Sequence, residues 1–109
     1  MEDQVDELRQ VCSEVLVSQE SGVKYYLLKD LKLPAGCDPA ATDALLCPTP
    51  RDGYPSRLFF AQRIASPKTQ NWFNGSHRIL DRNWFVYSWR LDVPGQRLAQ
   101  MLANHLRAF

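Results

Sequence analysis

The 109 residues suffice for one domain, because domains usually contain about 100 to 150 residues. Apolar residues make up 45% of the chain and charged residues 23%, both close to globular averages, which excludes a disordered chain, a collagen-like repeat and a coiled coil. Thirteen basic against twelve acidic residues leave a formal charge of +1, so we do not expect nucleic acid as a partner.

The apolar stretches are much shorter than the roughly 20 residues that a membrane-spanning helix requires, and the acidic N-terminal sequence differs from a secretory signal. We therefore expect no membrane association and a cytoplasmic location. The three cysteines form no Cys-x-x-Cys pair, and neither histidine has a neighbour at ligand spacing. This pattern predicts neither a metal site nor a disulfide scaffold, and no cofactor is expected.

The first predicted element is an amphipathic helix from Asp3 to about Val17. Its apolar residues recur at three- and four-residue steps: Val5, Leu8, Val11, Cys12, Val15 and Leu16. Gly22 suits the left-handed conformation that ends a helix. The segment from Val23 to Leu33 is rich in aromatic and branched side chains, which predicts the first strand.

Two more strands are predicted in the middle of the chain, at residues 42–47 and 57–64. The nine residues between them contain three prolines and one glycine and are too few for a crossover helix. We therefore expect neighbouring strands to pair antiparallel. Residues 65–76 contain proline, glycine and two asparagines, which indicates a long irregular loop.

The last two predicted elements are a strand and a helix. From His77 to Leu91 apolar side chains fall on both faces, which is typical of a strand covered on two sides. From Pro94 to Phe109 one helical face carries Leu98, Met101, Leu102, His105, Leu106 and Phe109. The order predicts one α+β domain over residues 1–109, with an antiparallel meander of about four strands and the helices on one face.

Candidate nucleophiles are few. Cys47 ends an apolar strand, and a buried core thiol explains it best, although Arg51 is near enough in sequence to lower its pKa. Ser76 and His77 are adjacent, but neighbours on an extended chain point to opposite sides, which favours a solvated loop histidine over a catalytic pair. Cys12 and His105 fall on apolar helix faces and are expected in the core.

Aromatic residues concentrate between residues 72 and 89, interleaved with arginines, a mixture that suits a protein hot spot or a stacking platform. Those from Trp84 to Trp89 are explained by a strand covered on both faces. Trp72 and Phe73 lie in the predicted loop, where core packing explains them less well. We therefore predict a partner-binding surface at Trp72 and Phe73.

Three segments carry a family resemblance. They are residues 31–60, which include the corner Asp52-Gly-Tyr-Pro-Ser56, residues 82–89, and residues 98–107. Together they resemble a prokaryotic family of ubiquitin-conjugating-enzyme-like proteins, whose members are encoded beside ubiquitin-like modifiers, activating enzymes and deubiquitinases. The resemblance implies a compact ubiquitin-conjugating fold, with Tyr54 and Pro55 at a corner that also belongs to the candidate partner surface. It leaves a role in antiphage defence open.

The resemblance also implies a position for the catalytic thiol, in the loop after the fourth strand. This sequence has no cysteine after Cys47 and no His-Pro-Asn motif. Because the thioester route needs a thiol that accepts and releases an acyl group, the resemblance implies a noncatalytic adaptor. Such an adaptor would bind the modifier, the activating enzyme or a catalytic conjugating partner. The alternatives are an atypical enzyme carrying the modifier on Cys47 or Ser76, and an unrelated small protein-binding module.

Overall fold

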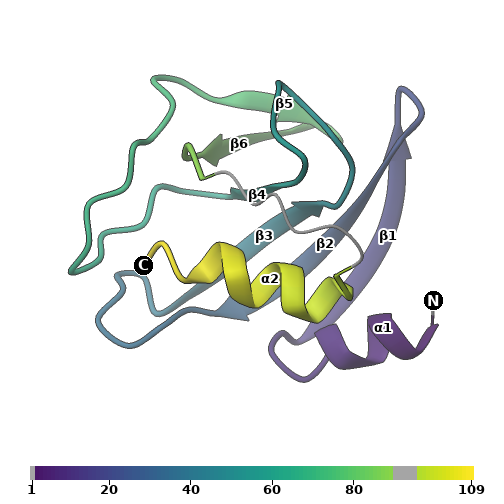
Figure 1. The fold of residues 1–109 in the computed structure, drawn as a ribbon, viewed down its shortest axis with the longest axis horizontal. Helices are drawn as coiled ribbons and strands as arrows, with labels where there is room; N and C mark the ends of the chain where they lie inside the picture. The colour runs from purple at the N-terminus through teal and green to yellow at the C-terminus, as the bar shows by residue number, and fades with distance from the viewer. Residues whose placement is uncertain (1, 90–95) are drawn as a thin grey trace.

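The computed structural model describes residues 2–89 and 96–109, which form one sheet and two helices (Figure 1). The helices are α1 (Glu2–Leu8) and α2 (Leu98–Leu106). The strands are β1 (Glu14–Glu20), β2 (Val23–Lys32), β3 (Ala41–Cys47), β4 (Arg57–Phe60), β5 (His77–Ile79) and β6 (Arg82–Val86). The predicted α+β class is confirmed, but the sheet has six strands and not about four.

All neighbouring strands run antiparallel, in the order β1-β2-β3-β4-β6-β5. The first four strands form a meander, of which β2, β3 and β4 were predicted and β1 was not. After β4 the chain passes through the predicted long loop to the outer strand β5, then returns through a tight turn so that β6 pairs with β4. Leu80 and Asp81 both have positive φ in that turn, at 51° and 63°. The single strand predicted from His77 to Leu91 is therefore a hairpin over residues 77–86, and residues 90–91 lie outside the described residues.

The N-terminal prediction was wrong in its length. The helix ends at Leu8, and residues 14–20, which overlap the end of the predicted helix, form β1. Ser21 and Gly22, with φ of 53° and 79°, make a two-residue hairpin turn that pairs Glu20 with Val23. The glycine is used for its left-handed conformation, as predicted, but in a hairpin and not at a helix end.

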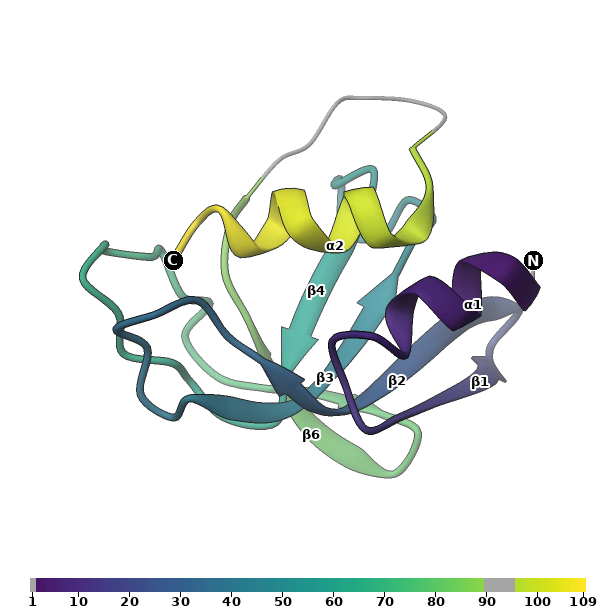
Figure 2. The same ribbon diagram turned by 90° about the horizontal axis from the view of Figure 1, so that it is seen from below.

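The sheet carries apolar residues on both faces. The helix-side core lies under α1 and α2, which Figure 2 shows on one side of the sheet, and includes Tyr26, Leu46 and Phe60. The far-side core fills the opposite face and consists of Tyr25, Leu45, Cys47, Phe59, Ile79, Trp84 and Val86. Along a strand, side chains enter the two cores alternately, because successive side chains point to opposite faces of a sheet.

The sheet curls around the far-side core. Although β1 and β5 are the two edges of the sheet, the backbone N–H of Leu80, just after β5, donates to Glu20 Oε2 at the end of β1 over 3.2 Å. Arg82 Nη2 lies 3.3 Å from Asp43 Oδ2 and joins β6 to β3. No helix in the described part of the chain is long and apolar enough to cross a membrane.

Candidate functional site

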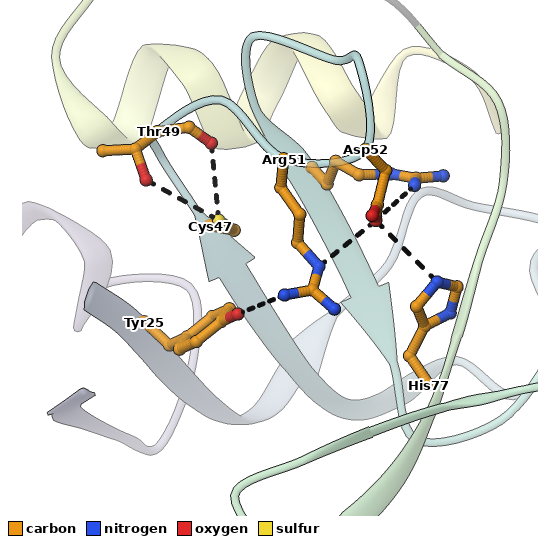
Figure 3. A network of polar contacts seen from close by, with 7 residues as sticks. Tyr25, Cys47, Thr49, Arg51, Asp52 and His77 are labelled. Carbon is orange, nitrogen blue, oxygen red and sulfur yellow. Dashed lines mark hydrogen bonds and ion pairs between the residues drawn. The ribbon is translucent and has the colours of Figure 1, made fainter. Parts of the chain in front are cut away.

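A polar cluster lies where the corner between β3 and β4 meets the start of β5. We call it the arginine cluster and define it as Tyr25, Arg51, Asp52, Arg57 and His77 (Figure 3). Tyr25 comes from β2, Arg57 from β4 and His77 from β5, so the cluster depends on strand pairing between distant segments.

A tight turn positions Asp52. Arg51 and Tyr54 exchange two backbone hydrogen bonds of 2.9 Å, with Asp52 and Gly53 between them at φ of 54° and 83°. Two successive positive φ values define a type I′ turn, for which Asp-Gly is a preferred pair. The turn holds the Asp52 carboxylate beside Arg57 at the start of β4 while leaving 41% of the Asp52 side chain exposed.

Three cationic or titratable groups surround one carboxylate oxygen. Asp52 Oδ2 lies 3.0 Å from Arg57 Nη1, 3.2 Å from Arg51 Nε and 3.8 Å from His77 Nε2. Arg51 also donates from Nη1 to the Tyr25 hydroxyl over 2.7 Å. Burial raises the pKa of Tyr25 above its usual value, with the positive charge of Arg51 acting in the opposite direction.

Aromatic rings pack against the side chains of the arginine cluster. The Arg57 guanidinium carbon lies 4.3 Å from the centre of the Tyr54 ring, and that of Arg51 lies 5.6 Å from the centre of Phe59. The His77 ring lies between Phe59 and Phe73, with centroid distances of 5.6 Å and 4.8 Å. Such stacking holds guanidinium planes in fixed orientations, which favours recognition of planar anionic groups.

Burial and charge keep His77 neutral. Desolvation is the largest effect and lowers the pKa of His77 below its usual 6.5; the nearby Asp52 raises it, while Arg51 and Arg57 lower it further. His77 is half-buried at the start of β5, with its side chain 19% exposed, and not a solvated loop residue. The arginine cluster therefore carries two guanidinium charges and one carboxylate charge at neutral pH.

The structure buries Cys47 and separates it from His77. The thiol is 0% exposed, belongs to the far-side core and donates to the backbone oxygen of Thr49 over 3.4 Å. Figure 3 shows Cys47 directed at Thr49, with Arg51 between it and His77. Ser76 is exposed, beside His77 in sequence. Cys47 and His77 therefore do not form a nucleophile–base pair, and burial closes the thiol to a protein-sized acyl donor.

The structure places Trp72 and Phe73 on opposite sides. Residues 71 and 73 exchange backbone hydrogen bonds with Ser88 and Val86, so this part of the loop continues the sheet beside β6. Trp72 turns toward the helix-side core, with its ring 5.4 Å from that of Tyr87 and 6.1 Å from that of Phe60. Phe73 turns outward, is 49% exposed and borders the arginine cluster.

A Ser–His contact was missed in the sequence. Ser56 Oγ lies 2.9 Å from His105 Nε2, a spacing that suits general-base activation of a serine. Ser56 is 3% exposed and His105 is 1% exposed, so substrate does not reach the pair. It joins the Tyr54–Pro55 corner to α2, and its residues are 49 positions apart, which is why sequence spacing gives no signal for it.

The described residues also include a small cleft between the two helices. A cleft of about 120 Å³ between α1 and α2, lined mainly by apolar side chains, is smaller than the pockets that usually hold small-molecule ligands. Within residues 2–89 and 96–109, no group of three or more His, Cys, Asp or Glu side chains is arranged to hold a metal ion.

Fold and site together define a small α+β domain with a curled antiparallel sheet and a half-buried, cationic, aromatic-lined cluster. Comparison of the chain with protein-family models, with curated proteins and with solved structures finds no match. Functional assignment therefore rests on the residues themselves.

Proposed function

We propose that this protein is a noncatalytic binding component of a ubiquitin-like modification pathway in the bacterial cytoplasm. In this role it binds the ubiquitin-like modifier, its activating enzyme or a catalytic conjugating partner. As part of this proposal, the domain has a compact ubiquitin-conjugating fold. The sequence resemblance supports this fold, and so does the order of helix, antiparallel strands, Tyr54–Pro55 corner and closing helix.

The complete burial of Cys47 is the observation that carries the noncatalytic part of the proposal. A thiol that receives a protein modifier must be reached by the C-terminus of that modifier, whereas the Cys47 thiol is 0% exposed and bonded to Thr49. A buried thiol in apolar surroundings behaves as a core residue and not as a nucleophile.

Aromatic and cationic groups gathered beside the exposed Phe73 ring support the binding part. Phe73, Tyr54 and the two arginines of the arginine cluster lie together, and aromatic residues and arginine are the residue types enriched at binding hot spots. Pro55, half-buried, stiffens the same corner by fixing its own φ.

The first test separates a binding protein from an enzyme. The protein is incubated with modifier, activating enzyme and ATP, then run on a nonreducing gel. We expect no thiol-labile adduct, because burial closes Cys47 to the modifier. We also expect no hydroxylamine-labile adduct on Ser76, because the next residue, His77, contacts Asp52, Phe59 and Phe73. An adduct that is lost in Cys47→Ala or in Ser76→Ala contradicts the proposal and establishes the atypical enzyme.

The second test addresses the pathway. Purified modifier, activating enzyme and conjugating partner are each offered to the immobilised protein, with Phe73→Ala as the surface variant. Phe73→Ala is expected to weaken binding without a change in melting temperature, because the side chain is half exposed. Retention of none of the three proteins by the wild type contradicts assignment to this pathway.

A further inference from the structure

The arginine cluster has more positive charge than its own carboxylate neutralises. Among the residues that the structure describes, Asp52 supplies the carboxylate within ion-pair distance of Arg51 and Arg57, and both guanidinium groups share its single Oδ2 atom. Arg57 is only 6% exposed. A buried guanidinium normally forms several hydrogen bonds, because removing the charge from water is costly unless it is paired.

Three polar atoms of the arginine cluster are buried without a hydrogen-bond partner: Arg51 Nε, Arg57 Nε and His77 Nδ1. Arg51 Nε lies 3.2 Å from Asp52 Oδ2, but its N–H does not point well at that oxygen. Buried polar side-chain atoms are satisfied in the great majority of cases, so the two unsatisfied N–H donors, Arg51 Nε and Arg57 Nε, indicate a site arranged for an additional acceptor.

The surroundings favour a peptide as the source of that acceptor. Asp52 is 41% exposed on its hairpin turn and is the acceptor that an incoming anion would replace at both guanidinium groups. Phe73, 49% exposed beside His77, offers an apolar contact next to the charge. The group already paired with both arginines is a carboxylate, whose planar geometry matches the guanidinium fork.

We propose that the arginine cluster binds a carboxylate of an acidic peptide segment in a protein partner, with the Asp52 carboxylate as its internal competitor. This inference deepens the proposed binding function, and rests on it for the nature of the partner. Arg51 and Arg57 donate to the carboxylate, and Phe73 contacts an apolar residue next to it in the peptide. Asp52 moves outward into solvent when the peptide binds.

The test titrates the full ¹⁵N-labelled chain with a capped pentapeptide that contains two glutamates and a leucine. The titration is followed by NMR at low ionic strength, because salt screens such contacts. Saturable shifts are expected at Arg51, Arg57, Phe73 and His77. The same peptide with glutamines in place of the glutamates is the control and is expected to give no saturable shift.

Two charge variants give opposite results if the inference is correct. Asp52→Asn removes the internal competitor and is expected to tighten peptide binding by about fivefold or more, whereas Arg51→Gln is expected to weaken it by about tenfold. Asp6→Asn and Arg9→Gln are the matched controls, because these residues form an exposed ion pair on the N-terminal segment. Both controls are expected to change the affinity by less than about twofold.

Three results overturn the inference: no saturable shift with the acidic peptide, inorganic phosphate binding more tightly than the peptide, or an unchanged affinity in folded Asp52→Asn. If Asp52→Asn does not fold, the wild-type titrations with peptide and phosphate decide. If the peptide binds but no pathway protein is retained, only the assignment to the modification pathway is contradicted. Retention of a pathway protein without peptide binding contradicts the ligand chemistry alone.

Discussion

His105 is a fully buried titratable residue whose charge state affects stability. Its Nε2 lies 2.9 Å from Ser56 Oγ, and its backbone oxygen accepts a 2.7 Å hydrogen bond from the Tyr87 hydroxyl. Desolvation, with the positive charge of Arg57 as the second cause, lowers the pKa of His105 to about 4. The imidazole is therefore neutral in the folded protein throughout the physiological range.

This lowered pKa predicts acid destabilisation between about pH 6.5 and pH 4. In that window the unfolded chain binds a proton at His105 and the folded chain does not, so the free energy of unfolding falls as pH falls. Between the ordinary histidine pKa of 6.5 and the pKa of about 4 in the folded protein, the loss is on the order of 3 kcal/mol. Urea unfolding measured across this range checks the slope.

Two variants separate His105 from the other histidine in that measurement. His105→Gln is less stable at neutral pH but loses much of the pH dependence. His77→Gln keeps most of it, because His77 is less buried than His105. An unchanged pH slope in His105→Gln contradicts the assignment.

At the scale of elements, the sequence predicts a helix for residues that form strand β1 in the structure. A helix through residues 3–17 places Val15 and Leu16 on the same buried face. In the strand they point to opposite sides: Val15 is 6% exposed in the helix-side core and Leu16 is 41% exposed. The two structures therefore predict different effects of the same pair of substitutions.

Alanine substitutions at these two positions test the strand. Val15→Ala removes buried methyl groups and is expected to lower the free energy of unfolding by about 2 kcal/mol. Leu16→Ala removes a side chain that is 41% exposed and is expected to lower it by about half as much or less. Equal, large losses in chemical denaturation would favour the helix.

Most element positions could be predicted from the sequence, and the exceptions have physical reasons. Val15, Leu16 and Val17 fit both a helical and an extended pattern, and pairing with β2 selects the strand. The hairpin at Leu80 and Asp81 has no Gly or Asn to indicate a turn.

Some residues of the candidate site were singled out from the sequence, and their binding role stays a prediction. Tyr54, Phe73 and His77 were singled out from the sequence, and the structure brings them together around Arg57 and Asp52. The Asp52-Gly53 pair carried a recognisable hairpin signal. The approach of Tyr25 to Arg51 depends on the pairing of β2, β3 and β4, for which the spacing of 26 residues gives no signal.

At the scale of the whole molecule, the two cores share the same three central strands. Adjacent residues on β2, β3 and β4 fill opposite cores: Tyr25 and Tyr26, Leu45 and Leu46, Phe59 and Phe60. Neither core can lose its packing without releasing strands on which the other depends. The molecule is therefore expected to unfold in one cooperative step, as small single domains usually do.

Tryptophan fluorescence checks this cooperativity because the cores contain different tryptophans. Trp84 lies in the far-side core, whereas Trp72 packs against the helix-side core. In a variant with both Trp72→Phe and Trp89→Phe, only Trp84 reports; in one with Trp84→Phe and Trp89→Phe, only Trp72 reports. Within each variant, the urea midpoint by fluorescence is expected to equal that by far-UV circular dichroism. A Trp84 transition that precedes the loss of secondary structure would show that the curled β5–β6 hairpin opens on its own and that the two cores are energetically separable.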